Sequence, residues 1–243
     1  MPNELTFEYI KEIYSLAVNT QRSRNWIYAI NLYETVVESA DQFYTPFALA
    51  GVAHCYNELG NRDLETATFK RVTQLPKRQQ RLLNPGWLAL CYQRSGAVGE
   101  ARTIHAETLK LVPHDLEATS ALAELSLIEG RLDQADIFAA ELQQRAEPAF
   151  QILGRIIRAL ANALRNKHDE AAEELSWVGR FIVSSGSIPV GLWDYSDLQP
   201  LVPKAGPNAN ALGVLFEALG GKIPYPDFTA KWGEIAPSSP TRA

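Results

Sequence analysis

The sequence predicts an all-α protein in which about five helical hairpins stack in a row as an α-solenoid, followed by an irregular, partly helical C-terminal cap. Three observations lead to this fold class. A pattern of large, small and aromatic residues recurs along the chain, and apolar residues follow helical spacing up to residue 184. After that point the composition changes, because residues 186–243 hold 8 of the 14 prolines and 7 of the 15 glycines.

The recurrence is clearest in the middle of the chain. One copy consists of Leu88, Ala89, Tyr92, Gly96 and Ala101, and the next consists of Leu122, Ala123, Gly130 and Ala135. The turn glycines and the small residues that follow them are both 34 residues apart (130 − 96 = 34 and 135 − 101 = 34). A period of this length built from paired helices resembles the tetratricopeptide repeat family. The resemblance implies a right-handed superhelix that serves as a binding surface.

The first two repeats are predicted from apolar spacing and turn residues. Repeat one covers residues 6–40. Repeat two opens with Thr45 as N-cap and Pro46 at the first helical position, turns at Gly60, and ends its second helix before Pro76. The small-residue position of repeat two falls on Glu65, whereas the nearest alanine is Ala67. Either the turn is two residues longer there or the two helices cross less closely.

Three further repeats follow. The basic stretch 77–83 lengthens the connection or adds a helical turn, and Asn84 with Pro85 then opens repeat three. Asp115 is the expected N-cap of repeat four, which ends before Pro148. Repeat five runs from Phe150 to about residue 183. Together these repeats predict a helical repeat domain over residues 1–184.

The C-terminal segment reads as a folded cap rather than as a disordered tail. Its aromatic and aliphatic content is too high for disorder, and solenoids need a cover for their last repeat. Short helices are expected over residues 209–219 and 228–235, the second with Asp227 as N-cap. We therefore predict a cap over residues 185–236 packed on the last repeat, and a flexible tail over residues 237–243.

Composition excludes several classes of partner. The net charge is −5, and no basic run interleaves with aromatic residues, so nucleic acid is not an expected partner. We expect no signal peptide and no membrane-spanning segment, which makes the cytoplasm the expected location. Cys55 and Cys91 occupy equivalent positions of successive repeats, where helices lie too far apart for a disulfide. Both are expected to be free, buried thiols.

The family resemblance places the binding surface on the first helices of the hairpins. Carried onto this chain, the partner-binding residues of that concave groove are Tyr14, Val18, Gln21, His54, Asn57, Trp87, Leu90, Arg94, Glu117 and Glu124. The positions at which one subfamily grips a terminal carboxylate hold Tyr14 and Val18, then Gly51, then Leu83 and Trp87. Because these side chains carry no cation, a C-terminal carboxylate is not the expected ligand.

The first helix of repeat five carries apolar residues at the positions that correspond to the groove. Ile156, Leu160 and Leu164 are too apolar to face water. Either a hydrophobic segment of a partner covers them or the C-terminal cap of the chain does. The cap is favoured because it supplies aromatic residues without a partner.

Reactive chemistry is not expected. The acidic cluster around His168 suits the first turn of a helix better than a metal ion. The sequence contains neither phosphate-loop pattern nor a nucleophile elbow. We therefore expect no enzyme activity, no cofactor and no metal, and predict a non-catalytic protein- or peptide-binding adaptor or chaperone-like assembly factor. The alternatives are a permanent subunit of a larger complex held through the convex or cap surface, and an enzyme with its site in the cap. The oligomeric state is left open.

Overall fold

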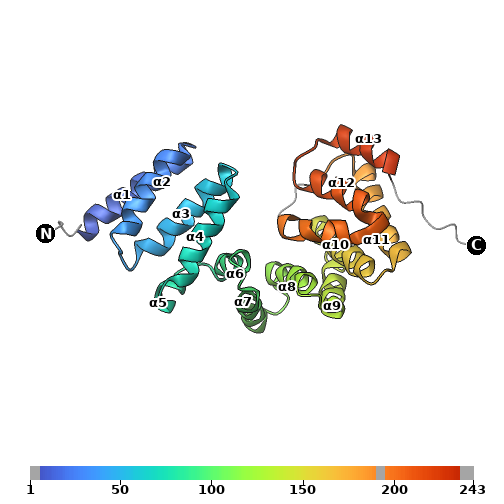
Figure 1. The fold of residues 1–243 in the computed structure, drawn as a ribbon, viewed down its shortest axis with the longest axis horizontal. Helices are drawn as coiled ribbons and strands as arrows, with labels where there is room; N and C mark the ends of the chain where they lie inside the picture. Colours follow the sequence, from blue (N-terminus) through green and yellow to red (C-terminus); the bar gives the residue numbers. More distant parts are fainter. Residues whose placement is uncertain (1–5, 190–194, 236–243) are drawn as a thin grey trace, which may run out of the picture. The chain divides into compact units, whose positions relative to one another are not determined.

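The computed structural model describes residues 6–189 and 195–235, and within them every regular element is a helix, which confirms the all-α class (Figure 1). The first elements are α1 (Phe7–Arg22), α2 (Trp26–Glu38), α3 (Tyr44–Glu58), α4 (Arg62–Gln74), α5 (Lys77–Gln80), α6 (Pro85–Arg94) and α7 (Val98–Leu111). They are followed by α8 (Leu116–Ile128), α9 (Leu132–Gln143), α10 (Pro148–Leu164), α11 (His168–Ser185), the 3₁₀ segment η1 (Tyr195–Asn208), α12 (Ala209–Leu219) and α13 (Tyr225–Ile235). None of the helices in these described ranges has the length and apolar character needed to cross a membrane.

The chain forms two compact units, Met1–Thr108 and Leu109–Ala243. In the first unit, α1 to α4 pack each on the next in chain order, and α6 packs on α4. In the second unit, α8 to α11 also pack each on the next in chain order, and η1 and α12 pack against these helices. The C-terminal segment therefore belongs to the compact second unit. The predicted tail, residues 237–243, lies outside the described residues.

Five helix pairs are joined by the same turn. The left-handed residues at these turns are Arg24, Gly60, Gly96, Gly130 and Asn166, with φ between 58° and 88°. At each turn the N–H of the left-handed residue donates to the carbonyl three residues back, and the next N–H donates to the carbonyl five residues back. This pair of bonds is the Schellman motif, which satisfies two carbonyls at a helix end. The next helix begins two residues after the left-handed residue, so each turn reverses the chain within a few residues.

A small residue follows four of the five turns at a fixed distance. Five residues beyond four of the left-handed positions lie Ala29, Ala101, Ala135 and Ala171, all fully buried. At the remaining position, after Gly60, lies Glu65, which is also buried. The turn at Gly60 has the same bonds as the others, so it is not lengthened. The repeat register therefore assigns Glu65, and not Ala67, to the small-residue position.

Two of the expected helix starts are confirmed and two are wrong. The side chains of Asn84 and Asp115 accept hydrogen bonds from the N–H groups of Trp87 (3.1 Å) and Ala118 (2.8 Å). Thr45 does not cap α3, because Asp41 Oδ1 accepts from the N–H groups of Phe43 (2.9 Å) and Tyr44 (2.7 Å) and the helix begins one residue before Thr45.

Asp227 does not cap α13 either. The helix begins at Tyr225, and the N–H of Phe228 donates to the carbonyl of Pro224 at 3.0 Å. Pro226 therefore lies inside the first turn, where a residue without an N–H loses no helical hydrogen bond.

The basic stretch 77–83 adds a helical turn, α5, instead of only lengthening the connection. Buried Gln80 holds this turn in place: its Nε2 donates to the carbonyls of Thr73 and Leu75, each at 2.9 Å. The Tyr92 hydroxyl donates to Gln80 Oε1 at 2.7 Å. Because these bonds lie in the interior, α5 is a fixed part of the first unit.

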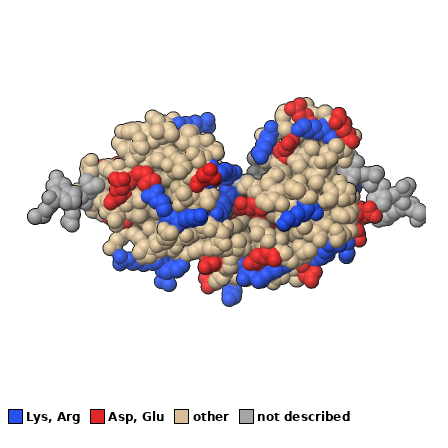
Figure 2. Space-filling model, viewed as in Figure 1, with Lys and Arg blue, Asp and Glu red and all other residues tan. Residues whose placement is uncertain are grey.

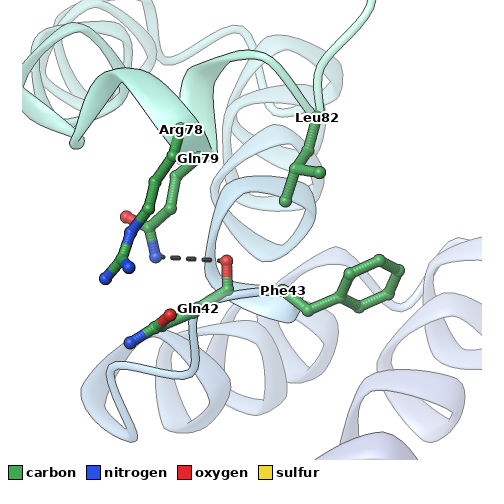
Figure 3. A pocket seen from close by; sticks show the side chains of 5 residues that line it. All are labelled: Gln42, Phe43, Arg78, Gln79 and Leu82. Atoms are coloured by element: carbon green, nitrogen blue, oxygen red, sulfur yellow. Dashed lines mark hydrogen bonds between the residues drawn. The ribbon is translucent and has the colours of Figure 1, made fainter.

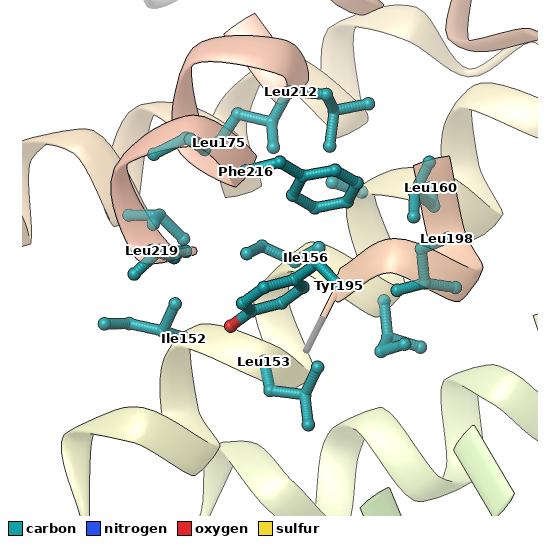
Figure 4. Packing of buried hydrophobic residues seen from close by; sticks show 14 of the residues in the cluster. Ile152, Leu153, Ile156, Leu160, Leu175, Tyr195, Leu198, Leu212, Phe216 and Leu219 are labelled. Atoms are coloured by element: carbon teal, nitrogen blue, oxygen red, sulfur yellow. The ribbon is translucent and has the colours of Figure 1, made fainter. Parts of the chain in front are cut away.

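The C-terminal segment covers the apolar first helix of repeat five. η1 packs on α8, α10 and α11, and its Tyr195 ring stacks on Phe216 of α12 with centroids 5.1 Å apart. Ile156 and Leu160 of α10 are fully buried in the same cluster (Figure 4). Of the two explanations offered for this apolar surface, the chain's own cover is the one the structure shows.

The outer helices α12 and α13 close this core. The ring of Trp232 lies where a Cβ atom at Gly179 of α11 would stand, 2.0 Å from the ring, so glycine is required at that point. The Tyr225 hydroxyl donates to the carbonyl of Val183 at 2.9 Å. These contacts tie α13 directly to α11.

The Schellman turns predict a matched pair of glycine variants in the second unit. Gly130→Ala should lower the free energy of unfolding by about 1 kcal/mol, because an L-residue is strained at φ 71°. Gly213→Ala, inside α12 with no neighbouring atom near the added methyl, should raise the free energy of unfolding by about 0.5–1 kcal/mol. Urea denaturation measures both, and equal effects of the same sign would contradict the turn assignment.

The close crossing at Ala135 predicts a second pair on α9. Ala135→Phe should cost about 1–3 kcal/mol, because the ring would overpack a fully buried position. Ala140→Phe, at an exposed position of the same helix, should change the free energy of unfolding by less than about 0.5 kcal/mol. Thermal and urea unfolding report the difference, and an unchanged Ala135→Phe protein would refute the packing register.

Candidate functional site

Eight of the residues expected to bind a partner lie in the first unit, on the first helix of each hairpin. We call these residues the first-helix face: Tyr14, Val18 and Gln21 of α1, His54 and Asn57 of α3, and Trp87, Leu90 and Arg94 of α6. α1 packs against α3, and α4 packs against both α3 and α6. The helix pairs therefore place all three first helices in one compact unit.

The α1 part of the face is an aromatic surface with one internal hydrogen bond. Tyr14 is half-buried, with its ring centroid 5.9 Å from that of Tyr33 and 5.1 Å from that of Tyr44. The Tyr33 hydroxyl donates to Gln21 Oε1 at 2.6 Å. Burial raises the pKa of both Tyr14 and Tyr33, so both phenols stay neutral at physiological pH. This part of the face is therefore uncharged, with its rings held in fixed positions.

Gly51 of α3 makes this arrangement possible. A Cβ atom at that position would lie 2.4 Å from the Tyr33 ring, which is closer than any real contact. The position therefore gives no side chain to the face, but it lets α2 approach α3. Val18 is half-buried and packs beside the same aromatic group.

Both members of the α3 part, His54 and Asn57, are exposed, and His54 rests on an aromatic ring. The His54 ring meets Trp26 of α2 edge-on, with centroids 5.9 Å apart. The imidazole is therefore supported by an aromatic ring while its remaining surface faces solvent.

Buried Glu65 of α4 links two members of the face. Only 4% of Glu65 is exposed. Asn57 Nδ2 donates to Glu65 Oε1 at 2.9 Å, and the Arg94 guanidinium lies 3.8 Å from the same oxygen. Arg62 pairs with Oε2 at 3.0 Å. Asn57 of α3 and Arg94 of α6 are therefore held together by a carboxylate that replaces the usual small residue.

Sequence reasoning did not include Glu65 among the site residues. The signal was present, because a charged residue at a position otherwise filled by alanine must find partners when it is buried. The positions of Asn57 and Arg94 in the neighbouring helices supply those partners.

Trp87 of α6 packs against the core of the first unit. The Trp87 ring lies edge-on to Phe69 of α4, with centroids 6.1 Å apart, and packs on the cluster that contains Leu49 and Val72. Leu90 is half-buried. Trp87 therefore supports the core as well as the face.

Glu117 and Glu124 belong to the second unit, on α8. Glu117 is exposed, whereas Glu124 is buried. Burial raises the pKa of Tyr195 in η1, and the nearby charge of Glu124 raises it further. The structure thus separates the two glutamates: Glu117 faces solvent, and Glu124 lies among buried groups near Tyr195.

The groups considered for reactive chemistry have other roles. Cys55 and Cys91 are free and buried, as expected. Burial raises the pKa of both thiols, that of Cys55 to about 11, so neither forms the thiolate that a nucleophile or metal ligand requires.

The acidic cluster at the start of α11 is partly neutralised by arginine. Glu174 pairs with Arg155 at 2.7 Å and with Arg158 at 3.5 Å, and the Arg155 guanidinium lies over the Trp177 ring at 4.1 Å. Across residues 6–189 and 195–235, no group of three or more His, Cys, Asp or Glu side chains has the arrangement of a metal site.

The surface of the described residues includes two hollows. One of about 500 Å³ lies at the α8–α9 turn, where Arg165 pairs with Asp133 (2.7 Å) and Asp136 (2.8 Å). The other, of about 210 Å³, lies between the α2–α3 turn and α5 (Figure 3). Charged groups of both signs are scattered over the surface seen in Figure 2.

The sequence matches no model of a known protein family and no curated protein.

The Glu65 cluster predicts a stability effect specific to this position. Glu65→Ala should lower the free energy of unfolding by about 1–3 kcal/mol, because Asn57 and Arg62 lose a buried partner. Glu58→Ala, at an exposed position near the end of α3, is the matched control and should be nearly neutral. Urea denaturation with a probe in the first unit, such as Trp26 fluorescence, measures the change. A Glu65→Ala protein as stable as the parent would show that the carboxylate is not needed there.

Proposed function

We propose that the chain is a tetratricopeptide-repeat-like α-solenoid with a right-handed superhelix, and that it binds a protein or peptide without catalysis, as an adaptor or a chaperone-like assembly factor. The observation that carries this proposal is the repeated turn. In five helix pairs the first helix ends in the same Schellman motif, at intervals of 34 to 36 residues, with a buried position five residues further on. Such regularity is typical of repeat proteins, in which each unit contacts its neighbours in sequence.

The chemistry of the first-helix face suits a peptide. Neutral tyrosines, the Gln21 amide and the exposed His54 offer aromatic contacts and hydrogen bonds on helices that are already folded. Binding to such a surface requires little ordering of the protein, which preserves affinity. The positions at which one subfamily grips a terminal carboxylate hold no cation in this chain, so we propose that the partner segment lies along the face.

The neutral, buried thiols support a non-catalytic role. A cysteine whose pKa is raised by burial is a poor nucleophile, and both cysteines are in that state. The cytoplasmic location expected from the sequence stays a prediction.

A specific observation favours the second candidate, a permanent subunit of a larger complex. Large apolar side chains are exposed on second helices of the hairpins: Ile27 (60%) and Tyr28 of α2, and Ile137 (67%) of α9. A contiguous patch of exposed apolar groups is typical of surfaces that meet another protein. In that case the partner would be held through the second helices and not through the first-helix face.

Site-specific photo-crosslinking separates the two candidates. A photoreactive residue is placed at His54 or Leu90 on the first helices, and at Tyr28 or Lys70 on exposed positions of the second helices. Adaptor binding predicts that one partner is captured from native lysate at His54 and Leu90 but not at Tyr28 and Lys70. Capture restricted to the second-helix positions would overturn the face as the site and support the permanent subunit.

A further inference from the structure

A small pocket lies outside the first-helix face, where the α2–α3 turn meets α5. Gln42, Phe43, Arg78, Gln79 and Leu82 line it, and its volume is about 210 Å³ (Figure 3). The turn supplies Gln42 and Phe43, and α5 and the residues just after it supply the others. Nothing in the repeat pattern requires α5, so the pocket is a feature that this chain adds to its helix pairs.

Hydrogen bonds fix the two sides of the pocket relative to each other. Gln79 Nε2 donates to the carbonyl of Gln42 at 3.2 Å, which joins α5 to the turn. On the other side of α5, Gln80 is bound to the carbonyls of Thr73 and Leu75. The turn itself is held by Asp41, whose Oδ1 accepts from two backbone N–H groups. The pocket is therefore preformed.

One wall of the pocket is apolar and open to solvent. Phe43 is 50% exposed and Leu82 is 40% exposed. The Phe43 ring is supported edge-on by Tyr44 (5.0 Å between centroids) and in a tilted arrangement by Phe47 (5.5 Å). An aromatic ring that is fixed in orientation yet half exposed is a ready anchor for another apolar side chain.

The other wall is polar and carries a positive charge. In Figure 3 the Arg78 guanidinium and the Gln42 amide lie on the side of the Gln79–Gln42 hydrogen bond away from Phe43 and Leu82. The stretch 77–83 contains Lys77, Arg78 and Arg81 and no acidic residue, although the whole chain has a net charge of −5. Figure 2 shows Lys and Arg side chains gathered over the α5 end of the first unit.

Of the charged groups near the pocket, Arg78 is the cation that remains to bind a ligand. The Lys77 ammonium is bound to the Tyr92 hydroxyl at 2.7 Å and to Gln80 Oε1 at 3.1 Å. Asp41, the carboxylate next to Gln42, is engaged in capping the turn. The Arg78 guanidinium on one wall and the supported Phe43 ring on the other favour a ligand that combines a carboxylate with an apolar side chain.

We propose that this pocket binds a short acidic segment of a partner protein, with a Phe or Leu side chain between Phe43 and Leu82 and an adjacent Asp or Glu carboxylate paired with Arg78. The positive stretch 77–83 attracts such a segment to a protein that is otherwise acidic. The inference is independent of the first-helix face, because none of its lining residues belongs to that face.

The test uses the full chain and a defined probe. A fluorescein-labelled, C-terminally amidated peptide, Ser-Asp-Glu-Phe-Glu-Asp-Ser, is titrated with the protein and fluorescence anisotropy gives the Kd. Arg78→Glu should raise the Kd by about tenfold or more, because it removes a charge-assisted pair. Arg81→Glu is the matched control, with the same charge change in the same stretch but outside the pocket lining, and should raise the Kd by less than about threefold through long-range charge alone.

Variants of the apolar wall and of the peptide complete the test. Leu82→Ser should weaken binding, whereas Leu59→Ser, an equally exposed leucine at the end of α3, should not. The peptide with Ser in place of Phe, and the peptide with Asn and Gln in place of the acids, should both bind more weakly. Circular dichroism melting confirms that each variant is folded.

Three results would overturn the proposal. One is the absence of peptide binding to the parent protein. Another is equal weakening by Arg78→Glu and Arg81→Glu, which would show unspecific charge attraction. The third is concentration-dependent self-association of the parent in sedimentation that Leu82→Ser abolishes, which would make a second copy of the chain the occupant. Because first-helix variants such as His54→Ala should leave peptide affinity unchanged, failure here does not bear on the proposed function.

Discussion

The fold depends on one constraint: where a helix ends, its last carbonyls need hydrogen-bond partners and the chain must reverse direction within a few residues. The last carbonyls of a helix have no partner inside it, and a left-handed residue lets the next two N–H groups turn back to them. This chain uses that solution five times, at Arg24, Gly60, Gly96, Gly130 and Asn166. Each turn has the same pair of bonds, and the next helix begins two residues after the left-handed residue. The regular spacing of the helix pairs and of the buried position after each turn follows from this constraint.

Departures from the repeat give the chain its individual features. Glu65 fills a position that is alanine in the other four pairs, and it draws Asn57 and Arg94 from neighbouring helices to satisfy its charge. The extra turn α5 enters between α4 and α6, held by Gln80, and creates a pocket with a cationic and an apolar wall. At the other end of the chain, η1 lies on α8 and α10 and buries side chains such as Ile156 and Leu160 that would otherwise face solvent. The repeated helix pairs are therefore modified locally, and two of these modifications, Glu65 and α5, bring polar and charged groups together.

The sequence predicted those parts of the fold that depend on local chemistry. The all-α class, the turns at Gly60, Gly96 and Gly130, and the caps Asn84 and Asp115 follow from residues whose preference is intrinsic. The left-handed Arg24 carries no such signal, because only its place in the repeat imposes the conformation. Asn166 carries a weaker signal than glycine, since asparagine adopts the left-handed region more readily than most residues. Thr45 and Asp227 looked like caps, but both lie inside helices that begin earlier, at Tyr44 and Tyr225. For the site, the sequence indicated which helix each residue lies on. It did not indicate that Trp87 would support the core or that Asn57 and Arg94 would meet at Glu65, since those contacts join distant segments.

The central claim is that the first helices of the pairs, supported by the repeated turn, form the surface that a partner protein uses. Hydrogen–deuterium exchange of the chain, alone and with its captured partner, tests this claim most directly because it reports every helix at once. The account predicts that protection on binding concentrates in α1, α3 and α6, with α2 and α4 unchanged. Protection confined to α2, α4 or α9, with α1, α3 and α6 exchanging as in the free protein, would contradict it.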